Sequence, residues 1–229
     1  MDTALIIDSL RDSCLFERAD ETVLGDIARQ LRRRRYRRNE VIFHQGDPGD
    51  SLHIVSSGAV KIVLPSLEGE EAIIATLRSG DFFGELALLD GAPRSATAVA
   101  VEASETWTLS RELMHSLLDQ DAALRDSLLA GLARELRRIT GHVQELHFLD
   151  LAGRLASRLA HLAREADPDA KAVRLDWPYT QSDLASMIGG TRQSVNKLLS
   201  VLVERGLVVI EKDTLSIPDV AALEREAER

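Results

Sequence analysis

The chain has 229 residues, of which 45% are hydrophobic, and this length and composition are typical of a globular protein with two domains. Its 28 basic and 37 acidic residues give a formal net charge of −9, which excludes a general attraction to nucleic acid or to an anionic membrane, so any nucleic-acid contact is expected to be local. The single cysteine, Cys14, excludes internal disulfides, an iron–sulfur cluster and a four-cysteine zinc site, and we expect a cytoplasmic protein because neither a signal peptide nor an apolar stretch of about 20 residues is present.

Residues 1–31 carry apolar side chains at helical spacing, which predicts two short helices. From about residue 33 to residue 109 the pattern changes to short β-rich runs, such as EVIFHQ and AIIATL, separated by turn sequences such as GDPGDS and RSGD. Several short strands at regular spacing are typical of an antiparallel barrel or sandwich. The arginine-rich residues 31–40 lead into these strands, and we interpret them as a solvated strand edge rather than as a nucleic-acid contact.

The run GELALLDGAPRSATA, residues 84–98, places three polar side chains among small and apolar residues. Either Glu85, Arg94 and Ser95 face water from two strands joined by a turn, or they converge on a ligand that has both charge and hydroxyl groups. The second interpretation fits a cyclic nucleotide. The planar guanidinium of Arg94 matches phosphate oxygens, the Ser95 hydroxyl can donate to them, and the Glu85 carboxylate can accept from the ribose 2′-hydroxyl.

A long helical segment is predicted over roughly residues 110–149. Within it, apolar residues at spacings of 3, 4, 3, 4 and 3 follow the a/d pattern of a coiled coil; they are Leu129, Leu132, Leu136, Ile139, Val143 and Leu146. A one-sided core helix is the alternative, but the charged flanks at residues 134–138 favour a seam between two copies of the chain, and hence a homodimer. The pattern breaks at Asp150, a predicted N-cap, so Leu149 and Asp150 are a candidate hinge.

Residues 173–217 predict a helix–turn–helix followed by two short strands. Thr180 and Asp183 fit a capping box, a glycine pair allows the turn, and Thr191 can cap the second helix. Gly206 stands where this second helix is expected to end. The predicted apolar faces consist of Leu184, Ala185 and Ile188 on the first helix and of Val195, Leu198, Leu199, Leu202 and Val203 on the second.

The opposite face of the second helix carries side chains that can read bases: Arg192, Gln193, Asn196, Lys197 and Ser200. Arginine and glutamine can each make paired hydrogen bonds to a purine, worth about 1–3 kcal/mol of base discrimination. We therefore predict a winged helix–turn–helix that binds DNA through this face and through the helix starts at Thr180 and Thr191. Two such helices in a dimer are expected to bind an inverted repeat with half-sites about 34–36 Å apart. Residues 180–206 carry three cations against two carboxylates, so binding is expected to depend strongly on salt.

Four stretches, in this order, resemble the cAMP receptor protein/fumarate-nitrate-reductase regulator (CRP/FNR) family, in its cyclic-nucleotide branch: GDPGDSLHIVSSGAVKI, GDFFGELALLDGAPRSATA, FLDLAGRLA and IGGTRQSVNKLLSVLVERGLV. The resemblance covers nearly the whole chain and implies an α+β fold in three parts. An antiparallel β-roll, the cyclic-nucleotide-binding jelly roll, is expected at residues 1–118. A long dimerisation helix is expected at residues 119–149, and a winged helix–turn–helix domain at residues 150–229.

The resemblance also implies the binding residues. Gly84, Glu85 and Leu86 are expected on the ribose side of a bound nucleotide, and Arg94 and Ser95 at its phosphate. Ile62 and Ala75 are expected to line the pocket, with Thr140 meeting the adenine amino group across the dimer. At the next position the resemblance implies a second hydroxyl side chain, but this chain has Gly141 there. This departure leaves the identity of the base open.

On the DNA side, the resemblance implies that Arg192 and Lys197 contact bases and phosphates. Gln193 stands where the cAMP receptor has a glutamate, which implies a half-site that differs from TGTGA at one position. The implied partners are an inverted-repeat operator, a second copy of the chain and RNA polymerase, with no membrane. The implied cofactor is cAMP as an allosteric ligand rather than a catalytic group.

Several alternatives follow from the same residues. The iron–sulfur branch of the family is disfavoured by the lone cysteine, and the haem branch because the six histidines show no ligand spacing, so neither of these groups and no metal site is expected. An enzyme is disfavoured because no nucleophile–base or paired-carboxylate arrangement is visible. The ligand alternatives are cGMP, a cyclic dinucleotide or none, and a cyclic-nucleotide module that acts through protein partners is a further possibility.

Overall fold

The computed structural model of the chain describes residues 3–13, 15–17, 19–66, 71–176, 179–212 and 214–228. Cys14 lies outside these residues. The chain divides into two compact units, which are described separately: Met1–Gly69 with Ile73–Arg138, and Glu70–Ala72 with Ile139–Arg229. Within the described ranges, no helix is long and apolar enough to cross a membrane.

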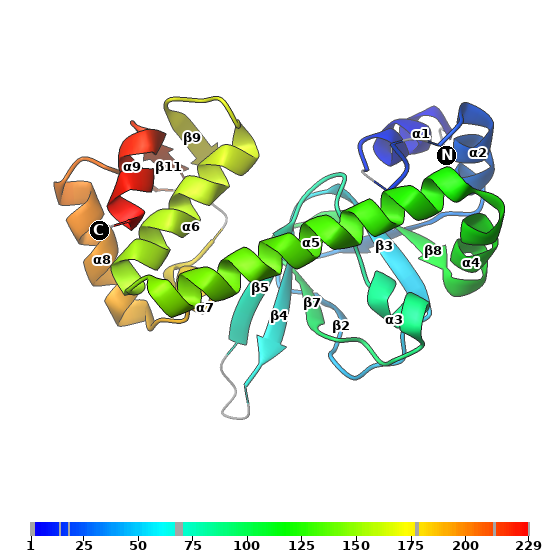
Figure 1. Cartoon of the computed structure of the whole chain (residues 1–229), viewed down its shortest axis with the longest axis horizontal. Coiled ribbons are helices and arrows are strands. Elements are labelled where there is room, and N and C mark those ends of the chain that lie inside the picture. The colour runs from blue at the N-terminus through cyan, green and yellow to red at the C-terminus, as the bar shows by residue number, and fades with distance from the viewer. Residues whose placement is uncertain are drawn as a thin grey trace. The chain divides into compact units, whose positions relative to one another are not determined.

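The first unit begins with two short helices, as predicted, and continues into short strands (Figure 1). The helices are α1 (Thr3–Arg11) and α2 (Glu21–Ala28), and the strands are β1 (Arg32–Tyr36), β2 (Val41–Phe43), β3 (Ser51–Ser57), β4 (Val60–Pro65), β5 (Glu71–Leu77), β6 (Phe82–Phe83), β7 (Thr97–Ala100) and β8 (Ser104–Ser110). They form two four-stranded sheets with the orders β1-β8-β3-β6 and β2-β7-β4-β5, in which the pairs β1–β8, β3–β8, β3–β6, β2–β7 and β4–β7 are antiparallel. The predicted antiparallel β-roll is confirmed.

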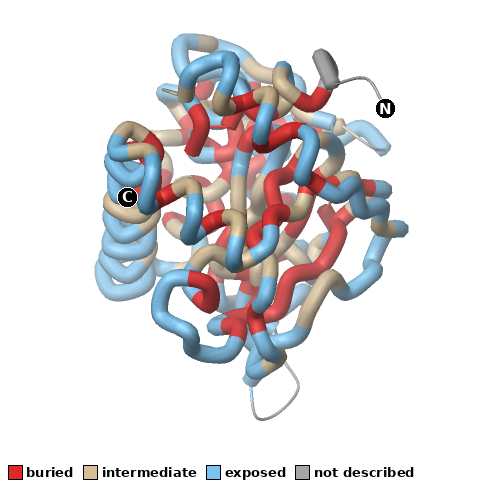
Figure 2. Tube along the Cα trace, turned by 90° about the vertical axis from the view of Figure 1, so that its right-hand side faces the viewer, coloured by how far each residue is buried: buried red, intermediate tan, exposed pale blue. Residues whose placement is uncertain are grey.

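Alternation along β3 separates two hydrophobic cores. Leu52 and Ile54 pack toward a core that includes residues of α1 and α2, whereas Val55 belongs to a second cluster inside the roll with Phe83 and Ala98. Figure 2 shows the buried positions of the chain in red. The arginine-rich strand β1 lies at the edge of its sheet with its arginines exposed, which agrees with the solvated strand edge expected from the sequence.

Residues 84–98 differ from a simple strand–turn–strand. The stretch contains a short helix, α3 (Glu85–Asp90), between Gly84 and Gly91, both of which adopt left-handed backbone conformations with φ of 83° and 74°. A left-handed backbone conformation has a low free-energy cost only at glycine. These two glycines therefore fix where the helix begins and ends. The turn predicted at residues 91–93 then leads to Arg94 and into β7.

The long helical segment is interrupted, contrary to the expectation of one helix over residues 110–149. It consists of α4 (Arg111–Gln120) and α5 (Ala122–Phe148), separated at Asp121, whose backbone is extended. Asp121 Oδ1 accepts hydrogen bonds from the Ala123 and Leu124 amides at 2.8 and 3.1 Å, so this side chain begins a new helix. The sequence pattern alone did not reveal the break because both helices carry apolar residues at helical spacing.

The second unit contains the end of α5, the helices α6 (Leu151–Ala166), α7 (Gln181–Ile188), α8 (Arg192–Glu204) and α9 (Val220–Ala227), and the strands β9 (Val173–Asp176), β10 (Val209–Glu211) and β11 (Thr214–Ile217). The strands form an antiparallel sheet in the order β10-β11-β9. The predicted helix–turn–helix with a small wing is confirmed. Helix α9 was not predicted, although Asp219 caps it by accepting from the Ala222 amide at 2.9 Å.

Candidate ligand-binding and nucleic-acid-binding sites

The backbone of Arg94 is tied to the GDPGDS loop that precedes β3. Its amide donates to the Asp47 carbonyl at 2.9 Å, and its carbonyl accepts from the Gly46 amide at 2.9 Å. Two segments that lie almost 50 residues apart in sequence therefore hold each other in place, and they fix the direction in which the Arg94 side chain leaves the backbone.

The Arg94 side chain is buried in the roll, with only 4% of its surface exposed. Nη1 donates to the Gly84 carbonyl and Nη2 to the Ser51 carbonyl, each at 2.7 Å, and the guanidinium lies 4.2 Å from the centre of the Phe43 ring. Carbonyls and an aromatic face stabilise a cation but do not neutralise it.

No carboxylate among the described residues forms a salt bridge with this guanidinium. Burial lowers the pKa of Arg94, whereas the carboxylates of Asp50 and Glu85 act in the opposite direction. Arg94 Nε is also buried without a hydrogen-bond acceptor from the described residues. A buried cation of this kind is costly unless an anion accompanies it, so the site is chemically suited to a bound phosphate.

Two glycines make room for Arg94. A Cβ atom on Gly84 would lie 2.4 Å from Arg94 Nη1, and one on Gly49 would lie 2.3 Å from the Ala87 Cβ atom and 3.3 Å from Arg94 Nε. Gly84 therefore serves this site in two ways, through its carbonyl and through the absence of a side chain.

Glu85, the first residue of α3, lies close enough to Arg94 for each charge to shift the pKa of the other. Burial raises the pKa of the Glu85 carboxyl, and the nearby Glu135 carboxylate on α5 raises it further. The Glu85 carboxylate and the Arg94 guanidinium therefore lie within electrostatic range of each other, and their convergence on one ligand stays a prediction. Ser95 is exposed, and its hydroxyl makes no hydrogen bond to the described residues.

The other predicted pocket residues lie on separate elements. Leu86 is exposed on α3, Ile62 on β4 packs against the inner cluster of the roll, and Ala75 on β5 is buried. Thr140 lies on α5 within the second unit, so its approach to a ligand in the roll stays a prediction, as does the effect of Gly141. A Cβ atom on Gly141 would meet nothing within 4 Å in the chain itself.

Sequence reasoning did not find the residues that hold Arg94. Ser51, Gly49 and Phe43 are separated from it by more than 40 residues, and the GDPGDS motif was interpreted as a turn and as part of the family resemblance, without a role at Arg94. Arg111 was also missed, although its guanidinium donates to the carbonyls of Gly49, Ala87 and Leu88 at 2.6–3.1 Å and so fastens α3 to the same loop. The repeated glycine–aspartate pairs were the only local signal.

A buried histidine lies beside this site. His53 stacks on Phe83 with ring centres 4.9 Å apart, and its Nδ1 lies 3.3 Å from the Thr106 hydroxyl. Burial, assisted by the positive charge of Arg94, lowers the pKa of His53 to about 3. The imidazole is therefore neutral at physiological pH, as expected for a ring in the interior of the roll.

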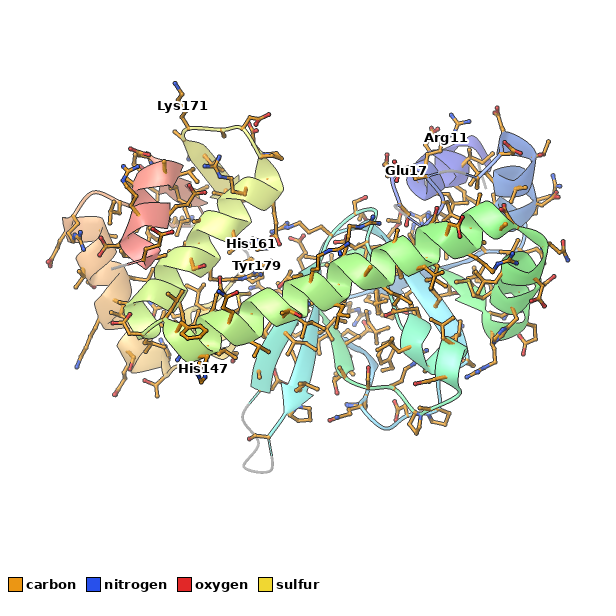
Figure 3. All side chains as sticks on the ribbon, viewed as in Figure 1. Arg11, Glu17, His147, His161, Lys171 and Tyr179 are labelled. Carbon is orange, nitrogen blue, oxygen red and sulfur yellow. The ribbon has the colours of Figure 1, made fainter. Side chains whose placement is uncertain are left out.

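The helix–turn–helix in the second unit is capped as predicted. Thr180 Oγ1 accepts from the Asp183 amide at 3.1 Å while Asp183 Oδ2 accepts from the Thr180 amide at 2.9 Å, which completes the capping box. Thr191 caps α8 by accepting from the Ser194 amide at 3.2 Å. Gly189 ends α7 in a left-handed conformation, and the buried ring of Tyr179, labelled in Figure 3, anchors the chain just before the first cap.

The predicted base-reading residues share the exposed face of α8. Val195, Leu199 and Leu202 form its buried stripe, whereas Val203 is 42% exposed, so its predicted place in the apolar face was wrong. Leu198 is only partly buried, so the buried stripe is narrower than expected.

The charges around α8 separate into two groups. Arg205 makes a paired hydrogen bond to Glu226 on α9, and Asp183 is engaged in the capping box, so neither contributes a free charge to the α8 face. The side chains of Arg192 and Lys197 make no ion pair with the described residues and are exposed. They are thus available for phosphates, as is the donor-rich Gln193 for a base edge.

The predicted seam residues of α5 are mostly exposed. Leu129, Leu136 and Val143 are 63%, 66% and 59% exposed, and Ile139 and Leu146 are also exposed, whereas Leu132 packs partly against the core of the first unit. The opposite face of the same helix buries Leu124, Leu128 and Gly131. Asp150 caps α6 by accepting from the Gly153 amide at 2.8 Å, which confirms the predicted end of α5 near Leu149.

Family models match both units. A model of the cyclic nucleotide-binding domain matches residues 33–121, and a model of the Crp-like helix-turn-helix domain matches residues 153–226.

Known proteins resemble the chain over most of its length. It is 31% identical over 214 residues to the CRP-like cAMP-activated global transcriptional regulator of Mycobacterium tuberculosis, which covers 93% of this chain and 96% of that protein. It is 35% identical over 197 residues to the cyclic AMP receptor protein of Thermus thermophilus, with 86% and 88% covered. Among solved structures, the c-di-GMP responsive global regulator CLP of Xanthomonas campestris has a TM-score of 0.74 at 25% identity, with 86% of this chain and 99% of that chain covered. The chain therefore belongs to the CRP/FNR family of DNA-binding transcriptional regulators.

Proposed function

We propose that this chain is a homodimeric transcriptional regulator that binds cAMP in its β-roll and an inverted-repeat operator through α8. The observation that carries the ligand half of the proposal is the buried guanidinium of Arg94, which has two carbonyl partners and, among the described residues, neither an acceptor for Nε nor a salt bridge to a carboxylate. An anion with a single negative charge, such as the phosphate of a cyclic nucleotide, satisfies this site.

The choice of cAMP rests on the relatives and on Glu85. The two curated relatives are named for cAMP, whereas the structural neighbour from Xanthomonas is named for c-di-GMP. Glu85 lies beside Arg94, and a ribose 2′-hydroxyl can donate to its carboxylate. Ser95 then supplies a hydroxyl at the phosphate, while Thr140 contacts the base.

The dimer is proposed from the exposed seam of α5. Leu129 and Leu136 are more than half exposed on one face of this helix. Burying their apolar surface would stabilise the protein by about 25 cal/mol for each Å² removed from water. A second copy of the same helix covers this face through the a/d pattern.

Ligand binding must reach the DNA through the hinge at Leu149 and Asp150. The ligand shifts the balance between two arrangements of the DNA-binding units only if it binds one arrangement more tightly than the other. The arrangement that is favoured then places two α8 helices at the spacing of an inverted repeat. A regulator of this kind acts in the cytoplasm and through RNA polymerase.

Titration calorimetry of the full chain with cAMP, cGMP and c-di-GMP tests the ligand proposal. We expect cAMP to bind with the highest affinity and at one molecule per protomer. Tighter binding of c-di-GMP would assign the site to that ligand, and no heat with any of the three would contradict a nucleotide sensor.

A further inference from the structure

Gln181 connects the two helices of the DNA-binding motif through a side-chain amide pair. It is the first residue of α7, and its Nε2 donates to Asn196 Oδ1 on α8 at 3.0 Å. The capping box of Thr180 and Asp183 fixes the backbone from which Gln181 extends. The Asn196 side chain makes no other hydrogen bond to the described residues and is exposed on the base-reading face.

This pairing gives the Asn196 amide a direction. Because Oδ1 accepts from Gln181, the two N–H groups of Nδ2 are the part of the Asn196 amide that has no partner among the described residues. An asparagine that presents only donors complements a base edge rich in acceptors, such as guanine O6 and N7 or thymine O4. An asparagine with Oδ1 facing outward complements the amino groups of adenine or cytosine instead.

We propose that Gln181 is a specificity-determining residue, which orients Asn196 as a hydrogen-bond donor and so favours guanine or thymine at one position of each half-site. This inference rests on the proposed DNA-binding function and extends it to one side chain that is not itself on the recognition helix. Gln181 acts here as a positioning residue, and Asn196 makes the contact.

Replacing the donor by an acceptor tests the orientation. In Gln181→Glu the carboxylate can only accept, so Asn196 Nδ2 turns toward it and Oδ1 turns outward. We expect the base preference at this position to change toward adenine or cytosine. In Gln181→Met, which has a similar volume and no strong hydrogen-bonding group, the preference is expected to disappear.

The measurement is selection from a pool of duplexes with randomised inverted half-sites, using the full chain with 3′,5′-cAMP, followed by dissociation constants for the enriched duplex and its single-base variants. The readout is the ratio of these constants, because the added charge of glutamate weakens all duplexes alike. We expect this ratio to change by about threefold or more between wild type and Gln181→Glu. Asn196→Ala is the matched control, and in its background the Gln181 substitutions are expected to change the ratio no further.

The outcomes separate the two proposals. If wild type enriches an inverted repeat and all Gln181 variants keep the same base at every position, the role of Gln181 is overturned while the DNA-binding function stands. If wild type enriches no sequence with or without cAMP, the proposed operator binding fails, and the inference fails with it. Thermal unfolding of each variant verifies that the surface substitutions leave the fold intact.

Discussion

Arg94 performs two tasks with one guanidinium. It links β3 to the start of α3 through the carbonyls of Ser51 and Gly84, and it leaves Nε and its positive charge for a ligand. Removing the whole side chain would therefore mix a loss of structure with a loss of binding. A substitution that keeps the charge but loses the planar fork separates them better.

We expect Arg94→Lys to weaken cAMP binding by about tenfold or more, because an ammonium cannot make paired hydrogen bonds to phosphate oxygens in the same geometry. Calorimetry measures the affinity, and urea unfolding measures the accompanying loss of stability. Ser51→Ala is the control, since it keeps the carbonyl that Arg94 uses and removes only the Ser51 hydroxyl, which lies 3.4 Å from Arg94 Nη2 and donates to Asp50 Oδ1 at 3.0 Å. An unchanged affinity in Arg94→Lys would show that the phosphate lies elsewhere.

His53 makes the stability of the roll depend on pH. Its pKa in the folded chain is about 3, lower than the ordinary value of 6.5, because burial disfavours the imidazolium. The unfolded chain therefore binds a proton first as pH falls, and the folding free energy that neutral His53 contributes is lost progressively below about pH 6.5.

Between pH 7 and pH 5 this residue alone is expected to lower the free energy of unfolding by about 2 kcal/mol. His53→Phe keeps an aromatic ring beside Phe83 but carries no titratable group, and the variant is expected to lose this part of the pH dependence. Urea unfolding of both proteins at the two pH values measures it. Equal pH dependence in wild type and variant would mean that His53 is not held neutral by the fold.

At the scale of elements, Arg154 on α6 joins three helices. Its guanidinium donates to the carbonyls of Leu146 and Leu149 at the end of α5 and of Ile188 at the end of α7, at 3.0–3.2 Å. Carbonyls at helix C-termini lack partners within their own helix and carry partial negative charge, so a cation between two such ends stabilises both.

We expect Arg154→Met to lower the free energy of unfolding by about 1–3 kcal/mol, since it leaves several of these carbonyls unpaired. Arg174→Met is the matched control in the same unit, because the Arg174–Glu211 pair is exposed and spans 3.6 Å. Its loss is expected to cost less than about 1 kcal/mol. Similar destabilisation by the two substitutions in urea unfolding would contradict the role assigned to Arg154.

The elements that could be predicted are those specified by neighbouring residues. The caps at Asp150, Thr180 and Thr191 each need only a side chain and an amide three residues later, so the sequence contains the whole motif. The break at Asp121 used the same chemistry but lay within a continuous helical pattern, where a polar residue also fits a solvent-facing position.

Contacts between distant segments could not be predicted from the residues alone. The sequence indicated that Glu85 and Arg94 converge because a short turn separates them, but nothing local indicated that Ser51 and Phe43 would enclose the guanidinium. The side-chain pair of Gln181 and Asn196 is another example, because it depends on how α7 crosses α8. Propensity and spacing describe one element at a time, and these sites are formed by packing between elements.

At the scale of the whole molecule, the proposed function requires that a ligand in the first unit change DNA binding by the second. The exposed a/d residues of α5 provide the route to a dimer, and the two-residue connection between α5 and α6 at Leu149 and Asp150 is the proposed hinge. Neither unit alone can show this coupling, so the decisive measurement uses the intact chain.

That measurement is the dissociation constant of the full-length protein for its selected inverted-repeat duplex, with and without saturating cAMP. The dissociation constant for a random duplex is measured under the same two conditions. We expect a dimer that binds the selected duplex at least about tenfold more tightly when cAMP is present, which corresponds to a coupling free energy of about 1.4 kcal/mol. The random duplex is expected to show little change. Identical affinity for the selected duplex with and without bound cAMP would contradict a cAMP-responsive regulator.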